Sequence, residues 1–271
     1  MKMRWLGILA LTALCAGAQG LFAQTGGITG IAHIAYRVSN LDKELAFLQK
    51  LGYEEAFGFT NAAGQTTEVF VKVNDRQFIE VYPQTEPTQA LGWMHVCYES
   101  DDINKLVATL AAHGLDPKPV RKAGAGNLIS SMDDPEHRVT EFTQYMPGSR
   151  HTLDKGLHLG AHRISDEMLG FELPVPDLEA ARKFYVAGMG FEAREGKNGL
   201  RLSLAGVADM RVQIRSAEAG AKPETLFRVT DAAKTASELE AAGLTAKQER
   251  NRVVVSDPDG NVFVFVAPRA R

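Results

Sequence analysis

Cysteine is nearly absent from this chain: Cys15 and Cys97 are the only two in 271 residues. Two cysteines cannot form a framework of several disulfides, or a site in which thiolates alone hold zinc. Neither sign of charge is in large excess, because 30 Lys and Arg residues stand against 33 Asp and Glu residues. A dedicated nucleic-acid-binding protein normally carries a basic surface, so we expect no nucleic-acid partner.

Long hydrophobic runs are also missing, except at the N-terminus. Residues 1–23, MKMRWLGILALTALCAGAQGLFA, combine a basic start, a short apolar run and then small residues. This order is typical of a secretory signal peptide, and the run is too short to cross a bilayer comfortably. We therefore expect cleavage after Ala18 or Ala23 and a periplasmic or secreted protein without membrane contact. A membrane anchor that stays attached is the alternative. A single remaining cysteine, Cys97, suits an oxidising compartment.

The rest of the chain repeats one pattern four times. Residues 38–56 resemble 175–194, and 100–117 resemble 229–246; each contains a turn, an amphipathic helix and a glycine. Short stretches of alternating apolar and polar residues, typical of strands, surround each helix. One unit, with one helix and about four strands, buries too little apolar surface to be stable alone. We therefore expect paired units, and the segment 147–168, rich in Gly, His and charge, as the linker between two domains.

Five short motifs occur in a telling order: IAHIAYRVSNLD (31–42), FIEVYP (78–83), GWMHVCYESDDI (92–103), DDPEHRVTEF (133–142) and DPDGNVFVFV (257–266). In this order the chain resembles the vicinal oxygen chelate superfamily over residues 28–268. That superfamily includes glyoxalase I, bleomycin and fosfomycin resistance proteins, methylmalonyl-CoA epimerase and type I extradiol dioxygenases. The resemblance implies an α+β fold of four βαβββ units, paired into two cup-like domains with mixed sheets. Residues 28–146 would form the metal-binding domain and residues 169–268 a second, degenerate domain.

The resemblance also implies a metal site in the first domain. Its ligands would be His33, Glu80, His95 and Glu141, each on a different strand, around one divalent metal ion (Zn, Ni, Co, Mn or Fe(II)). Two imidazoles with carboxylates suit such an ion and leave positions open for substrate oxygens. Glu80 is the expected catalytic residue, as ligand or proton carrier; a surface or outer carboxylate is the alternative for this residue.

The second domain departs from this ligand pattern. Aligning the repeats places Gly170, Gln213, Glu224 and Val264 at the four ligand positions. Glycine and valine have no side-chain donor, so we expect no second metal. A pairing of units across the two halves would break the ligand set. The ligands therefore imply that units one and two pair with each other.

Other reactive side chains have simpler interpretations. Cys97 follows His95 by two residues on a predicted strand, and we expect a buried, inert thiol. The histidines of the linker, His151, His158 and His162, are expected to be solvated. The glycine-rich segment 123–127 lacks the strand-to-helix context of a phosphate-binding loop, and we expect a mobile loop at the mouth of the cup.

The function implied by the resemblance is that of a glyoxalase- or epimerase-type metalloenzyme, a lyase or isomerase. It would chelate vicinal oxygens of a small-molecule substrate and transfer a proton through an enediolate. One alternative is an Fe(II) extradiol-type dioxygenase with His33, His95 and Glu141 as ligands. Another is a binding or resistance protein without catalysis. A homodimer is left open.

Overall fold

The computed structural model describes residues 27–217 and 221–268; the expected signal peptide, residues 1–23, lies outside them. Unit one contains β1 (Ile28–Val38), α1 (Leu41–Lys50), β2 (Glu54–Thr60), β3 (Thr66–Lys72) and β4 (Phe78–Pro83). Unit two contains β5 (Gly92–Ser100), α2 (Ile103–Ala112), β6 (Arg121–Lys122), β7 (Leu128–Asp133) and β8 (Val139–Gln144). A short helix, α3 (Arg150–Leu153), follows within the expected linker.

Units three and four repeat this order. Unit three contains β9 (Met168–Val175), α4 (Leu178–Arg182), β10 (Glu192–Gly196), β11 (Gly199–Leu204) and β12 (Val207–Ser216), and α4 continues as a π-helical turn over Lys183–Gly188. Unit four contains β13 (Glu224–Arg228), α5 (Ala232–Ala241), β14 (Lys247–Glu249), β15 (Arg252–Ser256) and β16 (Val262–Val266). Within the described residues, no helix is long and apolar enough to cross a membrane.

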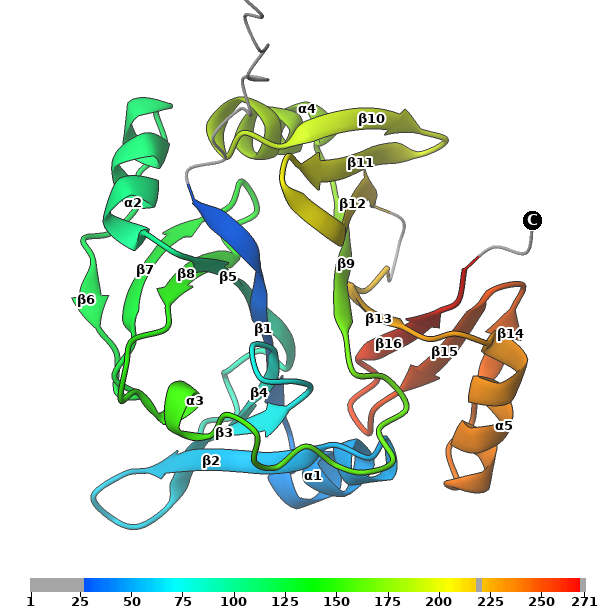
Figure 1. The fold of residues 1–271 in the computed structure, drawn as a ribbon. Helices are drawn as coiled ribbons and strands as arrows, with labels where there is room; N and C mark the ends of the chain where they lie inside the picture. Colours follow the sequence, from blue (N-terminus) through cyan, green and yellow to red (C-terminus); the bar gives the residue numbers. More distant parts are fainter. Residues whose placement is uncertain (1–26, 218–220, 269–271) are drawn as a thin grey trace, which may run out of the picture.

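The strands form two mixed sheets of eight strands, one from each half of the chain (Figure 1). Their orders are equivalent: β2-β3-β4-β1-β5-β8-β7-β6 in the first sheet and β10-β11-β12-β9-β13-β16-β15-β14 in the second. Units one and two therefore share a sheet, as the ligand argument required. The expected fold class, α+β with four βαβββ units paired into two cups, is confirmed.

Local sequence signals set the helix bounds. The side chains of Asn40, Asp102 and Asp231 accept hydrogen bonds from the backbone N–H three residues later, which caps α1, α2 and α5. Directly after these helices, Gly52, Gly114 and Gly243 have φ between +73° and +82°, a conformation that glycine adopts without steric cost. The repeated turn, helix and glycine thus have a direct structural cause.

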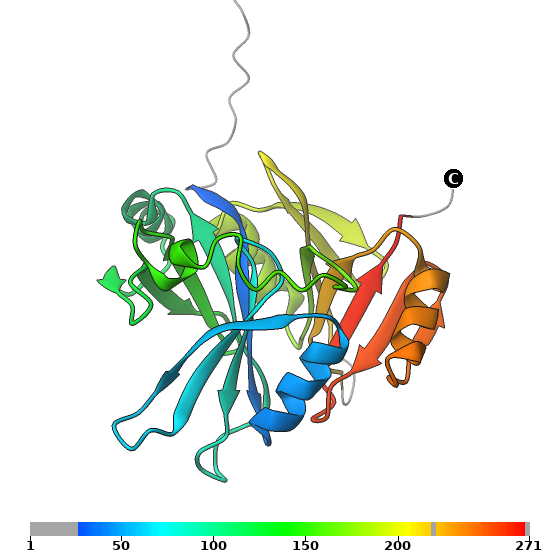
Figure 2. The same cartoon turned by 60° about the horizontal axis from the view of Figure 1, so that its bottom comes forward.

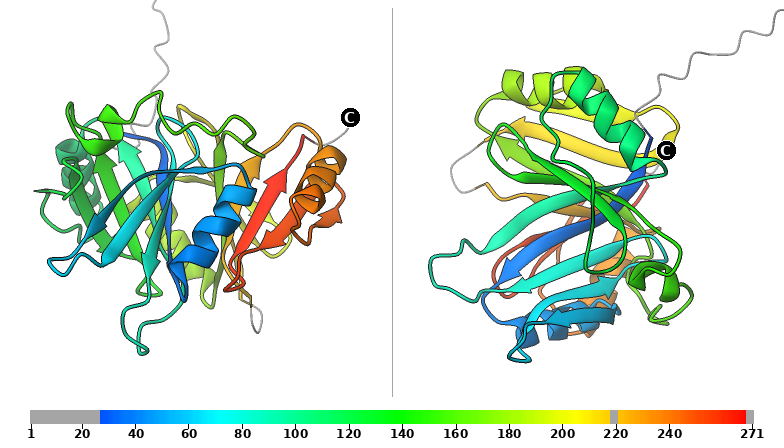
Figure 3. Two further views of the ribbon diagram at one scale, coloured as in Figure 1. Left: turned by 90° about the horizontal axis from the view of Figure 1, so that it is seen from below. Right: turned by 90° about the vertical axis from the view of Figure 1, so that its left-hand side faces the viewer.

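The two cups pack back to back through one continuous apolar core. The ring centroids of Tyr36 on β1 and Phe263 on β16 are 5.6 Å apart, as are those of Trp93 and Phe171. Phe47 on α1 also contacts Phe263, at 5.3 Å, and Figure 2 shows α1 beside β16. A second contact lies at the end of α2, where His113 Nδ1 is 2.8 Å from the carbonyl oxygen of Gly188 in the π-helical turn that continues α4 (Figure 3, right). The concave faces of the cups therefore point away from each other.

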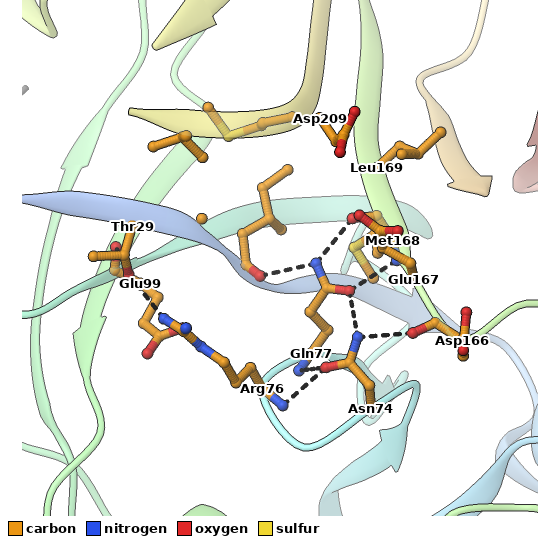
Figure 4. Close-up of a pocket in the computed structure, with 14 residues that line it drawn as sticks. Thr29, Asn74, Arg76, Gln77, Glu99, Asp166, Glu167, Met168, Leu169 and Asp209 are labelled. Atoms are coloured by element: carbon orange, nitrogen blue, oxygen red, sulfur yellow. Dashed lines mark hydrogen bonds and ion pairs between the residues drawn. The ribbon is translucent and has the colours of Figure 1, made fainter. Parts of the chain in front are cut away.

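A polar cavity of about 380 Å³ lies where β1, the β3–β4 turn and β9 meet (Figure 4). Gln77 spans it: its Nε2 donates to the carbonyl oxygen of Met168 at 2.8 Å, and its Oε1 accepts from the Met168 N–H at 2.8 Å. Its neighbour Asn74 donates to the Asp166 carbonyl oxygen at 2.8 Å. These side chains bind the two domains together, and this cavity is separate from the expected metal site.

Candidate metal centre

The register of the first sheet brings the expected ligands onto one concave face. His33 on β1 pairs with Cys97 on β5, and Cys97 pairs with Glu141 on β8. In the adjacent row, Glu80 on β4 and His95 on β5 both pair with Ala35 on β1. Residues directly opposite each other, or two apart on a strand, project to the same side of a sheet. Four strands therefore each supply one side chain to the same point.

Three of the four expected ligands converge tightly. Glu80 Oε2 lies 3.1 Å from His33 Nε2 and 2.9 Å from His95 Nε2, and the two Nε2 atoms are 3.1 Å apart. All three side chains are buried. The fourth, Glu141, is half-buried, and its Oε1 lies 3.6 Å from His33 Nε2. Glu141 forms a second group of donor atoms with His33 and the thiol of Cys97.

These distances fit a divalent metal ion. Donor atoms bound at ~2.1 Å and at right angles to each other lie ~3 Å apart, close to the three observed separations. Glu80 Oε2 and His33 Nδ1 are also buried without a hydrogen-bond partner among the described residues. A buried carboxylate oxygen without a partner is costly unless a cation compensates it. The donor set, two imidazoles with carboxylates, suits the ions expected from the sequence.

The protonation of the neighbouring groups is unusual. Burial alone would raise the pKa of Glu80, but His33 and His95 outweigh it and hold that pKa well below its usual range. The Tyr82 hydroxyl donates to Glu80 Oε1 at 2.8 Å. On the next strand, burial and the proximity of Glu80 raise the pKa of Glu68 to about 9. The surroundings therefore push the pKa values of the two carboxyl groups in opposite directions, as in acid–base pairs of active sites.

The site lies in a cavity of about 210 Å³. Its lining includes His33, Glu80 and Glu141, the segment 123–125, and side chains without a role in the sequence interpretation: Phe59, Glu68, Phe70, Tyr82, Arg121, Tyr145 and His151. Strand alternation could have found two of these, since Glu68 shares a face with Phe70, and Tyr82 with Glu80. The glycine-rich segment lies at the cavity as expected, but it is a hydrogen-bonded turn between β6 and β7, where Ala123 N–H donates to the Asn127 carbonyl oxygen at 2.8 Å.

His151 corrects the expectation that the linker histidines are solvated. It lies on α3 and is only 4% exposed. Its ring stacks on Tyr145, with centroids 5.0 Å apart, and the rings of Phe57, Phe70 and Phe78 meet it edge-on at 4.8–4.9 Å. Burial lowers the pKa of His151 to about 3. His158 and His162 are exposed as expected, and His158 Nδ1 lies 2.5 Å from Asp154 Oδ1.

Cys97 is buried, as expected. Burial, with Glu141 and Glu80 nearby, raises the pKa of its thiol well above the usual range. The thiol form is a poor nucleophile and a poor metal ligand.

The register of the second sheet confirms which residues replace the ligands. Gly170 pairs with Arg211, just as His33 pairs with Phe78 in the first sheet. Gln213 and Glu224 both pair with Glu172, just as Glu80 and His95 both pair with Ala35. Val264 pairs with Leu226 as Glu141 pairs with Cys97. Glu224 is held by an ion pair with Arg252. In the described part of the second domain, no group of three His, Cys, Asp or Glu side chains could hold a metal.

Comparison with known proteins now decides the family. Two sequence models, both described as the Glyoxalase/Bleomycin resistance protein/Dioxygenase superfamily, match residues 32–130 and 167–265. The chain belongs to this superfamily. The superfamily is the same group as the vicinal oxygen chelate proteins, so the resemblance inferred from the five motifs is confirmed. No curated protein sequence matches the chain.

Three solved structures resemble the fold over most of the chain. The Mn(II)-bound glyoxalase from Novosphingobium aromaticivorans aligns with a TM-score of 0.66 and 16% identity, over 89% of this chain and 82% of its own. The 2,3-dioxygenase LapB from Pseudomonas sp. KL28 aligns with a TM-score of 0.67 and 15% identity, over 90% and 93%. A catechol 2,3-dioxygenase aligns with a TM-score of 0.67 and 12% identity, over 90% and 91%. At these identities the likeness shows a shared fold.

Proposed function

We propose that the chain is a metal-dependent enzyme that moves a proton at a carbon atom beside vicinal oxygens of a small substrate, as glyoxalases and epimerases do. The observation that carries the proposal is that the Glu80 carboxylate meets His33 and His95 at one point, in a cavity that the Glu68 carboxyl group also lines. A Mn(II)-bound glyoxalase with the same fold supports it.

In this proposal His33, Glu80 and His95 hold the metal, with Glu141 beside them. A bound divalent metal supplies Lewis acidity, which stabilises negative charge on substrate oxygens. Ionised Glu80 accepts the proton from carbon, while the Tyr82 hydroxyl, donating to Oε1, fixes the orientation of the carboxylate. Glu68 carries a proton that can be returned to the substrate. Phe59 and Phe70 supply an apolar wall to the cavity.

Exchange of carbon-bound hydrogen tests the proposal. The protein is prepared without chelator or nickel affinity resin, and a panel of α-hydroxycarbonyl compounds is followed by NMR in D2O. We expect exchange that depends on the metal, and a loss of ~100-fold in Glu80→Gln, the scale of lost acid–base catalysis. Glu54→Gln, an exposed change on β2, is the matched control and should leave the rate unchanged. If Glu80→Gln left the exchange rate unchanged, Glu80 would not be the residue that transfers the proton.

A ring-cleaving Fe(II) oxygenase is the second candidate. It is favoured by the two dioxygenases that align over 90% of the chain. In that case His33, His95 and Glu141 are the ligands, the purified protein contains iron, and Glu80→Gln changes turnover little. For the glyoxalase-type activity, the proposed export from the cytoplasm makes a glutathione-dependent substrate a poor candidate, because glutathione is mainly cytoplasmic.

A further inference from the structure

The concave face of the second cup carries arginines where that of the first cup carries phenylalanines. The strand registers match three positions: Phe57 with Arg194, Phe70 with Arg201, and Phe78 with Arg211. In the first cup these rings surround His151, which α3 supplies. The described residues beyond β16 are Ala267 and Pro268, and they contain no counterpart of α3.

This arrangement of charge does not stabilise the sheet. Arg194 and Arg201 are direct partners on neighbouring strands, and like charges in that position are destabilising. Of the carboxylates on this face, Glu172 and Glu224 already have partners: Glu172 lies 2.5 Å from Arg215, and Glu224 is paired with Arg252. Among the described residues, no ion pair neutralises Arg194, Arg201 or Arg211.

Two of these arginines, Arg201 and Arg211, border a cavity. A hollow of about 420 Å³ lies on the face, within the range of ~300–1,000 Å³ found for ligand pockets. Its polar lining contains no carboxylate; it consists of Arg201, Arg211 and Arg252, the last of which is ion-paired with Glu224, and the amides of Gln213 and Asn251. The formal charge of the whole chain is −3, so this cluster runs against the overall balance of charge.

We propose that the second cup binds a small organic anion with two or more carboxylate or phosphate groups. The planar guanidinium of arginine pairs with both kinds of group through two parallel hydrogen bonds, and the amides of Gln213 and Asn251 add hydrogen-bonding groups. Among the described residues of this cup, no three His, Cys, Asp or Glu side chains could hold a metal, and Gly170 and Val264 stand where the first cup has His33 and Glu141. The second domain is then a binding site in its own right, independent of the chemistry of the first.

Calorimetric titration of the full chain tests this site. Citrate and pyrophosphate are the probes, and the protein is first dialysed free of metal, so that an anion cannot bind through a metal in the first cup. We expect saturable binding of at least one probe, weakened ~10-fold by Arg201→Ala or Arg211→Ala, since a charge-assisted hydrogen bond contributes about 1.5–3 kcal/mol. Lys105→Ala, which removes the same charge from α2, is the control and should bind like the unchanged chain.

The melting temperature supplies a second readout. Because Arg201 faces Arg194, Arg201→Ala should melt at the same temperature or higher while it loses the anion, which separates a binding role from a structural one. Three results would overturn the proposal: no saturable binding of either probe, equal weakening by Lys105→Ala, or binding of polyglutamate with neither small anion bound. The last result would assign the face to an acidic protein instead.

Discussion

At the scale of single residues, a hydrogen-bond partner determines which ring nitrogen of His151 carries the proton. Asn127 Oδ1 accepts the Met146 backbone N–H at 3.2 Å, which fixes the orientation of the buried amide. Its Nδ2 then donates to His151 Nδ1 at 2.8 Å. Nδ1 is therefore an acceptor, and in the neutral ring the proton is on Nε2. The aromatic rings around it favour this neutral form, in line with a pKa of about 3.

This assignment predicts how stability depends on pH. The pKa of His151 is lower in the folded chain, about 3, than the ~6.5 of an unfolded chain. Between pH ~6.5 and 3, His151 binds a proton in the unfolded chain but not in the folded chain. Stability is therefore lost as pH falls from ~6.5 towards 3. In His151→Gln, which does not titrate, the melting temperature should fall less steeply over this range. Thermal melting at pH 7, 5 and 4 measures the difference.

The control for this experiment is His162→Gln, which removes an exposed histidine near the same segment. It should keep the steep pH dependence of the unchanged chain. If the melting temperatures of the His151 variant and the control depended on pH in the same way, the pKa of His151 would not be lowered in the folded chain.

At the scale of elements, α1 carries a carboxyl group into the interface between the cups. Glu44 is buried, and both of its carboxyl oxygens lack a hydrogen-bond partner among the described residues. Burial, with Asp257 of the second domain nearby, raises the pKa of Glu44 to about 9. Its helical neighbours explain the burial, because Phe47 and Leu48 place the same face of α1 in the core.

Glu44 therefore predicts a pH dependence of the opposite sign. Its pKa is ~4.5 in an unfolded chain and about 9 in the folded one, so its contribution to stability is complete below ~4.5 and is lost as pH rises towards 9. Glu44→Gln should raise the melting temperature at pH 8 and change it little at pH 4.5. Glu54→Gln, on the exposed strand β2, should have no such effect. A Glu44→Gln chain that melts lower at pH 8 would contradict the assignment.

An element could be predicted from the sequence where the residues that determine it lie close to it in the chain. Caps such as Asn40 and stops such as Gly52 act within a few residues, so the repeat predicted the helices and the paired units. The docking of α3 has a distant cause. Lys72 on β3 is fully buried and donates to Asp154 Oδ2 at 2.8 Å, which ties the segment after α3 to the sheet. Nothing near His151 in the sequence reveals this contact, and so its place beside the metal ligands was missed.

The four expected ligand positions could be located in the sequence because the family's motifs mark their positions on the strands. Three of them converge as expected, and Glu141 lies beside His33. Glu68 was missed although it alternates with Phe70, because its importance comes from the proximity of Glu80 on the neighbouring strand. Whether two side chains on different strands lie close together depends on how the strands pair in the sheet. The sequence around Glu68 alone therefore does not reveal that Glu80 is its neighbour.

At the scale of the whole molecule, two cups with one fold have diverged in what their concave faces carry. The apolar core behind both is shared, so each cup supports the other. The first face has aromatic rings, two imidazoles and carboxylates, whereas the second has arginines at the aromatic positions. The proposed enzyme site and the proposed anion site can occupy one chain in this way, because they lie on faces that point in opposite directions.

This asymmetry predicts one divalent metal ion per chain. His33, Glu80 and His95 converge within 3.1 Å in the first cup. The equivalent positions in the second cup are Gly170, Gln213 and Glu224, and the last is held by Arg252. A lone amide with a paired carboxylate cannot hold a transition metal against water.

His95→Ala should therefore abolish metal binding in the whole protein, because no second site retains any. Glu224→Ala, the equivalent change in the second cup, should keep the full metal content and is the matched control. Elemental analysis of both variants and of the unchanged chain, each with its concentration determined by amino-acid analysis, measures the ratio. Two metals per unchanged chain, or undiminished metal in His95→Ala, would place the ion elsewhere, because the register leaves His95 no substitute among the described strands of either cup.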